Sequence, residues 1–78
     1  MNYKNRITSD YKIMLGKPVI KGTRITIELI LRKMSEGATA TTILKMYPKL
    51  ELEDLMACLN YAADVIAKEE IIEIAKAS

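Results

Sequence analysis

The feature that most constrains the fold is a change in hydrophobic period at Thr26. Before this residue, the apolar positions are mostly β-branched and are interrupted by glycine and proline, which is typical of short extended segments. After it, apolar residues recur three, four and seven positions apart, as Ile27, Ile30, Leu31 and Met34. This spacing places them on one side of an α-helix. The sequence therefore predicts a small β element that leads into helices.

The extended segment covers residues 6–25 and ends in the stretch GKPVIKGTRI. Its β-branched side chains favour one small hairpin or two short strands. Gly22 lies where a turn or a positive φ is expected. Arg24, between two β-branched residues, is expected to be anchored at the junction of strand and helix.

Two helices are expected next. Thr26 is a suitable N-cap for the first helix, and Gly37 follows its end. Thr39 caps a second, shorter helix over residues 40–46, which Pro48 terminates.

The third helix begins at Glu51 or Leu52 and has the clearest apolar stripe. The members of this stripe are Leu55, Cys58, Leu59, Ala62 and Ile66. Nothing between Glu53 and Ala77 breaks a helix, so one long rod is one alternative. The other is a break or bend near Lys68 followed by a short fourth helix, and it is favoured because a single helix to the C-terminus would exceed ordinary helix lengths.

The predicted fold class is mainly α. A short N-terminal β element precedes a three-helix helix-turn-helix bundle, homeodomain-like or winged-helix-like, and a C-terminal helical tail follows. Residues 1–25, 26–67 and 68–78 form these three parts, all within one domain.

The 78 residues include no histidine and one cysteine. The lack of imidazole excludes most general-base chemistry and the usual zinc-ligand sets, and Cys58 is expected in the core. We therefore expect no enzymatic activity, no metal and no cofactor. No apolar run approaches the roughly 18 residues of a membrane span, and the polar N-terminal residues do not resemble a signal peptide. A cytoplasmic protein is expected.

Charge is distributed unevenly along the chain. Residues 1–33 carry a net charge of +6 and residues 34–78 a net charge of −4. A basic half suits an anionic partner such as DNA, and an acidic half suits a basic protein surface. The candidate DNA-binding residues are Lys17, Lys21, Arg24, Arg32, Lys33, Lys45, Lys49 and Asn60.

A short helix followed by a long one across a tight connector is typical of a helix-turn-helix, but bundles without DNA activity show the same pattern. Three acids, Glu51, Glu53 and Asp54, lie at the start of the presumed reading helix. They would repel phosphates there, so both interpretations stay open.

Residues 7–65 resemble the domain-of-unknown-function family numbered 433. The resemblance rests on a G-K-P-V-I-x-G-T-R-I segment, a helix ending in E-G, a short helix ending in Y-P and a last helix carrying Y-A-A-D. The matching residues are Gly16, Pro18, Gly22, Thr23, Arg24, Glu36, Gly37, Tyr47, Pro48, Tyr61, Ala62 and Asp64. Many relatives have Ser or Thr before the last helix, where this chain has Glu51, a weaker cap.

This resemblance implies a helix-turn-helix domain of the VapB-like antitoxin kind, commonly encoded beside a PIN-like toxin. The first hypothesis is thus an antitoxin homodimer that binds operator DNA and neutralises a PIN-like toxin through Ile71, Ile72 and Ile74 of its tail. Packing of these isoleucines on the same chain is the alternative. The second hypothesis is a protein-interaction module that does not bind DNA.

Overall fold

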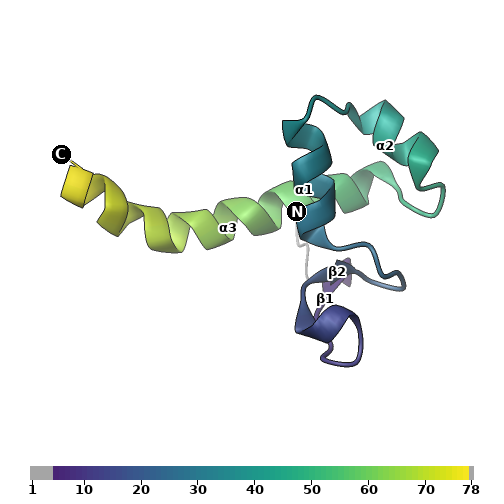
Figure 1. Cartoon of the computed structure of the whole chain (residues 1–78), viewed down its shortest axis with the longest axis horizontal. Helices are drawn as coiled ribbons and strands as arrows, with labels where there is room; N and C mark the ends of the chain where they lie inside the picture. The colour runs from purple at the N-terminus through teal and green to yellow at the C-terminus, as the bar shows by residue number, and fades with distance from the viewer. Residues whose placement is uncertain (1–4, 78) are drawn as a thin grey trace.

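The computed structural model describes the backbone of residues 5–77 and the side chains of residues 5–68. Strands β1 (Ile7–Thr8) and β2 (Val19–Ile20) precede helices α1 (Ile27–Ser35), α2 (Ala40–Met46) and α3 (Leu52–Ala77). In Figure 1, the strands, α1 and α2 gather at one end of α3, and the rest of α3 projects as a rod. The predicted order of a short β element and three helices in a mainly α fold is confirmed.

The two strands pair antiparallel, with Ile7 opposite Ile20 and Thr8 opposite Val19. Val19 also forms a bridge with Thr26, so β2 lies between β1 and the start of α1. Both residues of β2 are buried, which explains the β-branched pair at this place in the sequence.

The segment between the strands includes the short 3-10 turn η2 (Met14–Gly16) and has an unusual backbone. Met14 and Leu15 have φ values of 51° and 56°, in the left-handed region that costs residues other than glycine about 1–2 kcal/mol each. Two side-chain hydrogen bonds add to the backbone ones here: the Ser9 hydroxyl donates to the Gly16 carbonyl, and the Lys12 N–H donates to Asp10 Oδ1 at 2.9 Å.

The starts of α1 and α2 follow the predicted caps. Thr26 Oγ1 accepts a hydrogen bond from the Leu29 N–H at 3.0 Å, and Thr39 Oγ1 accepts one from the Thr42 N–H at 3.2 Å. Gly37, just past α1, has a φ of 99°, a conformation that favours glycine. These local signals fix both helix boundaries.

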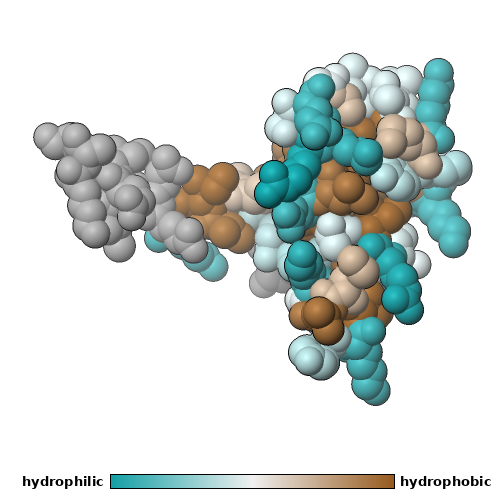
Figure 2. All heavy atoms as spheres, viewed as in Figure 1, coloured by the Kyte–Doolittle hydropathy of each residue, from teal (hydrophilic) through white to brown (hydrophobic). Residues whose placement is uncertain are grey.

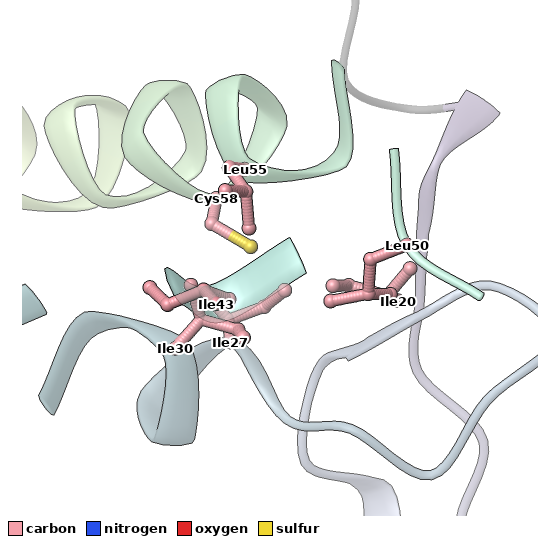
Figure 3. Packing of buried hydrophobic residues seen from close by; sticks show 7 residues of the cluster. All are labelled: Ile20, Ile27, Ile30, Ile43, Leu50, Leu55 and Cys58. Atoms are coloured by element: carbon pink, nitrogen blue, oxygen red, sulfur yellow. The ribbon is translucent and has the colours of Figure 1, made fainter. Parts of the chain in front are cut away.

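The core lies where the strands and the three helices meet. Figure 3 shows Leu55 and Cys58 pointing from α3 toward Ile43 of α2 and toward α1, with Leu50 beside Ile20. The buried cluster comprises Ile20, Ile27, Ile30, Ile43, Leu50, Leu55 and Cys58. Full burial of one such aliphatic side chain contributes roughly 1.5–3 kcal/mol. Ala57, also fully buried, adds little bulk to the core-facing side of α3.

One expectation about α3 is wrong. The helix continues from Leu52 to Ala77 without the break expected near Lys68. The predicted apolar stripe is buried only in its first part, because Leu59 and Ile66 are 47% and 51% exposed. The buried cluster takes Leu55 and Cys58 from α3, and the helix extends past the rest of the protein (Figure 1), so its later described side chains, over residues 63–68, are exposed. The side chains of Ile71, Ile72 and Ile74 lie outside the described residues.

No helix within the described part of the chain combines the length and the apolar character that a bilayer crossing requires.

Candidate functional site

An ion pair between distant parts of the sequence positions the start of α3. Arg6 Nη1 donates to Asp54 Oδ1 at 3.0 Å and lies 3.5 Å from Glu51 Oε1. The Asp54 side chain is only 10% exposed, and the hydrogen bond to it raises the pKa of Arg6 above its ordinary value. This contact ties the N-terminal segment to α3.

Asp54 also caps α3. Its Oδ2 accepts a hydrogen bond from the Glu51 N–H at 2.8 Å, and its own N–H donates to the Glu51 carbonyl at 2.9 Å. This is the half of a capping box in which the third helical residue reaches back to the cap. Glu51 itself is therefore a weak cap, as expected, but Asp54 compensates for it.

The acidic start of α3 is consequently less repulsive toward DNA than the sequence suggests. Arg6 faces two of the three carboxylates, those of Glu51 and Asp54. Glu53 is exposed and forms no ion pair among the described residues. The role of Arg6 was not predicted from the sequence, because its partner Asp54 lies 48 positions away. The three-residue spacing of Glu51 and Asp54 was the signal that the sequence offered for the cap of α3.

Lys17 and Arg32, two of the predicted DNA-binding residues, share one carboxylate. Arg32 Nε lies 3.1 Å from Glu28 Oε2, and Lys17 Nζ lies 3.7 Å from Glu28 Oε1. Arg32 first, and Lys17 second, lower the pKa of the Glu28 carboxyl below its ordinary value. Two cations around one anion leave a single net positive charge on this side of α1.

The turn between β2 and α1 is built to present Arg24. Gly22 has a φ of 81°, as its predicted role requires. The Thr23 hydroxyl donates to the Ile20 carbonyl at 2.7 Å and accepts from the Ile25 N–H at 3.0 Å. Thr23 thus closes the turn, and Arg24 projects from it.

Arg24 and Lys49 line one shallow recess. Arg24 comes from the β2–α1 turn and Lys49 from the α2–α3 connector, and Ile13, Gly22, Thr23 and Ile25 form the remaining wall. Both cations are exposed, and neither has a hydrogen-bond or ion-pair partner among the described residues. The expectation that Arg24 is anchored is wrong, because Thr23 holds the turn and Arg6 is the arginine that links distant elements.

The remaining predicted DNA-binding residues are more scattered. Lys21 and Lys45 are exposed, the first beside the β2–α1 turn and the second in the last turn of α2. Lys33 is half-buried in the last turn of α1. Asn60 is half-buried and already engaged in an interaction within the protein. The structure therefore brings together Lys17 with Arg32, and Arg24 with Lys49.

Two groups of exposed apolar side chains bear on function. Tyr11, Met14 and Leu15 on the strained segment are 77%, 41% and 76% exposed. Leu52 and Met56, on the first turns of α3, are 52% and 51% exposed. This face of α3 carries no basic residue before Lys68, so it is poorly suited to reading DNA by itself.

Cys58 belongs to the core, as expected. It is fully buried, and desolvation first, with the negative charge of Asp54 second, raises the pKa of its thiol to about 11. A protonated, buried thiol is a poor nucleophile. Over the described residues, no group of three or more His, Cys, Asp or Glu side chains is arranged to hold a metal ion.

The fold and this site define a small, mainly α protein in which a β2–α1 turn and a helix connector present cations on one recess. Residues 7–62 match the model of a family described as "Protein of unknown function (DUF433)". The match covers more than half of the chain, so the protein belongs to this family. Comparisons with curated proteins and with solved structures found no match.

Proposed function

We propose that this protein is a non-enzymatic, cytoplasmic antitoxin of a toxin–antitoxin pair. It binds operator DNA as a homodimer and neutralises a PIN-like toxin. The single observation that supports the DNA-binding part most strongly is the recess that holds Arg24 and Lys49. Exposed cations without an internal partner are available for phosphate, whereas Lys17 and Arg32 are already engaged with Glu28.

The proposed contact uses the phosphate backbone. Arg24 binds one phosphate, Lys49 binds a neighbouring one, and Lys21 adds charge beside them. Each neutralised phosphate releases counterions, so affinity falls with salt by a slope of about 0.9 per phosphate. Loss of two contacts should therefore reduce the slope by roughly 2.

A charge-matched pair of variants tests this contact. One variant carries Arg24→Ala and Lys49→Ala, and the control carries Lys12→Ala and Lys68→Ala, which removes the same charge from exposed positions elsewhere. Fluorescence anisotropy measures binding to DNA from upstream of the reading frame, and to a shuffled duplex, at several salt concentrations. We expect the recess variant alone to lose specific binding; equal losses in both variants would refute the site.

The toxin-binding part rests on the resemblance to VapB-like antitoxins and on the acidic, isoleucine-rich sequence of residues 68–78. Its test is co-expression with the product of the neighbouring reading frame, followed by pull-down and size-exclusion chromatography. Removal of residues 68–78 should abolish the complex and leave cooperative unfolding intact. A complex that survives the truncation would place toxin binding elsewhere.

A protein-interaction module without DNA binding is the second candidate. The exposed apolar side chains of Met14 and Leu15, held on a strained backbone, favour it, because such strain clusters at functional sites. The anisotropy titration separates the two: binding that is equal for operator and shuffled DNA and falls steeply with salt supports the module.

A further inference from the structure

An apolar groove runs between α1 and the base of the rod. Its volume is about 590 Å³. We name it the α1–α3 groove and define it by Lys17, Leu31, Arg32, Tyr61, Val65 and Ile66. Figure 2 shows hydrophobic side chains on α3 where the rod leaves the body. Of the groove residues on α3, Val65 and Ile66 are 39% and 51% exposed. The apolar stripe that the sequence places on α3 thus continues beyond the core into an uncovered surface.

The chain exposes more surface than a compact monomer of its size. It exposes 5777 Å², whereas the scaling relation for monomers gives roughly 4,800 Å² at a mass of 8.8 kDa. Its radius of gyration is 13.7 Å, against about 11.5 Å for a compact domain of this length. The excess of roughly 1,000 Å² matches the approximately 800 Å² that each partner buries in a standard interface.

The chain's own tail is not placed to cover this groove. Residues 52–77 contain neither glycine nor proline and form one helix, which leads away from the body. A return to the groove would require several helical turns to unwind. The occupant must therefore come from another molecule.

The charges favour a second copy of the same rod. The rim of the groove carries one net positive charge, from Lys17 and Arg32 around Glu28. Residues 64–73 contain four acids, Asp64, Glu69, Glu70 and Glu73, against Lys68 alone. A rod from another copy would bring apolar surface to apolar surface and acids to this basic rim.

We propose that two copies of this chain pair through the α1–α3 groove, each receiving the rod of the other. The interface is isologous: a twofold axis relates the two copies, so the rod of each copy lies in the groove of the other. The strands offer a poorer alternative, because β2 is paired on both sides and β1 presents an outer edge of only two residues. This surface excludes Arg24 and Lys49. The inference rests on the homodimer of the proposed function and names its interface: a monomeric wild type would overturn both, whereas loss of DNA binding in the Arg24 and Lys49 variant would leave the pairing intact.

The first test is the mass in solution by light scattering at about 100 µM chain, above the micromolar dissociation constants of weak interfaces. We expect a dimer for the wild type and a folded monomer for Val65→Glu with Ile66→Glu. The matched control, Leu52→Glu with Met56→Glu, changes equally exposed residues of the same helix outside the groove and should remain a dimer. A monomeric wild type, or a groove variant that remains dimeric, would overturn the proposal.

A charge exchange keeps the proposal testable if the groove variant does not fold. One variant reverses the rim, with Lys17→Glu and Arg32→Glu, and a second reverses the four acids of residues 64–73 to lysine. Each alone should be monomeric, and an equimolar mixture should form a one-to-one heterodimer because both exchanged contacts are restored. Failure of the mixture to associate, while the wild type dimerises, would refute the exchange of rods.

Discussion

Replacement of Asp54 by alanine tests the link between the N-terminal segment and α3. The change removes a nearly buried carboxylate, only 7% exposed as a residue, that accepts hydrogen bonds from Arg6 at 3.0 Å and from the Glu51 N–H at 2.8 Å. The Arg6 guanidinium is left without its closest partner, and the cap of α3 is lost.

The expected cost follows from these two interactions. A helix cap contributes about 1 kcal/mol, and a hydrogen bond that involves a charged group contributes about 1.5–3 kcal/mol. The free energy of unfolding should therefore fall by about 2–4 kcal/mol, a large part of the total for a small domain. At roughly 4–8 °C per kcal/mol, the midpoint of thermal unfolding should fall by about 8–32 °C.

Thermal and urea unfolding, followed by circular dichroism, measures this loss. Glu53→Ala is the matched control, because it removes the same charge from the same turn at an exposed position without an ion pair, and should cost less than about 0.5 kcal/mol. In an Arg6→Ala background, Asp54→Ala should cost less than in the wild type. Equal effects of Asp54→Ala and Glu53→Ala would show that only the helix dipole matters and would refute the anchor.

Two further predictions concern the core and the strained segment. Because the folded state holds the Cys58 thiol protonated up to a pKa of about 11, against an ordinary value of 9.0, the unfolding free energy should fall as pH rises from 9 to 11. The fall should exceed that of Cys58→Ala by about 2 kcal/mol in urea titrations across this range, and parallel profiles would contradict it. Leu15→Asn should raise the unfolding midpoint by a few degrees, since asparagine tolerates a φ of 56° better and the leucine side chain is exposed. Leu29→Asn, in the regular helix α1, should lower the midpoint instead, and a loss at both positions would argue against the left-handed backbone at residue 15.

The helix boundaries could be predicted because their signals are local. Thr26 and Thr39 cap their helices through hydrogen bonds that span three residues, and glycine at position 22 permits the positive φ that the turn requires. The cap at α3 was harder, since the bond runs backward from Asp54 rather than forward from Glu51.

The candidate site could be predicted only in part. Composition identified the cations, but which of them are neutralised depends on contacts between elements. Arg32 pairs with Glu28 four positions away, a spacing visible in the sequence, whereas Arg6 pairs across 48 positions. Arg24 and Lys49 meet at one recess because two turns, separated by α1 and α2, lie against each other, and no local pattern encodes that proximity.

Helix α3 joins two halves that are stabilised differently. Its first turns are held by Asp54, by Arg6 and by the burial of Leu55 and Cys58. Beyond this capped base, none of the described side chains of residues 61–68 is fully buried, and an isolated helix shorter than about 12–15 residues is marginal in water. The helical content of the rod should therefore depend both on propagation of the helix from its capped base and on association with a partner. Asp54→Ala, which removes the cap and the contact with Arg6, should therefore weaken the pairing of two copies as well as the fold, even though Asp54 lies outside the α1–α3 groove.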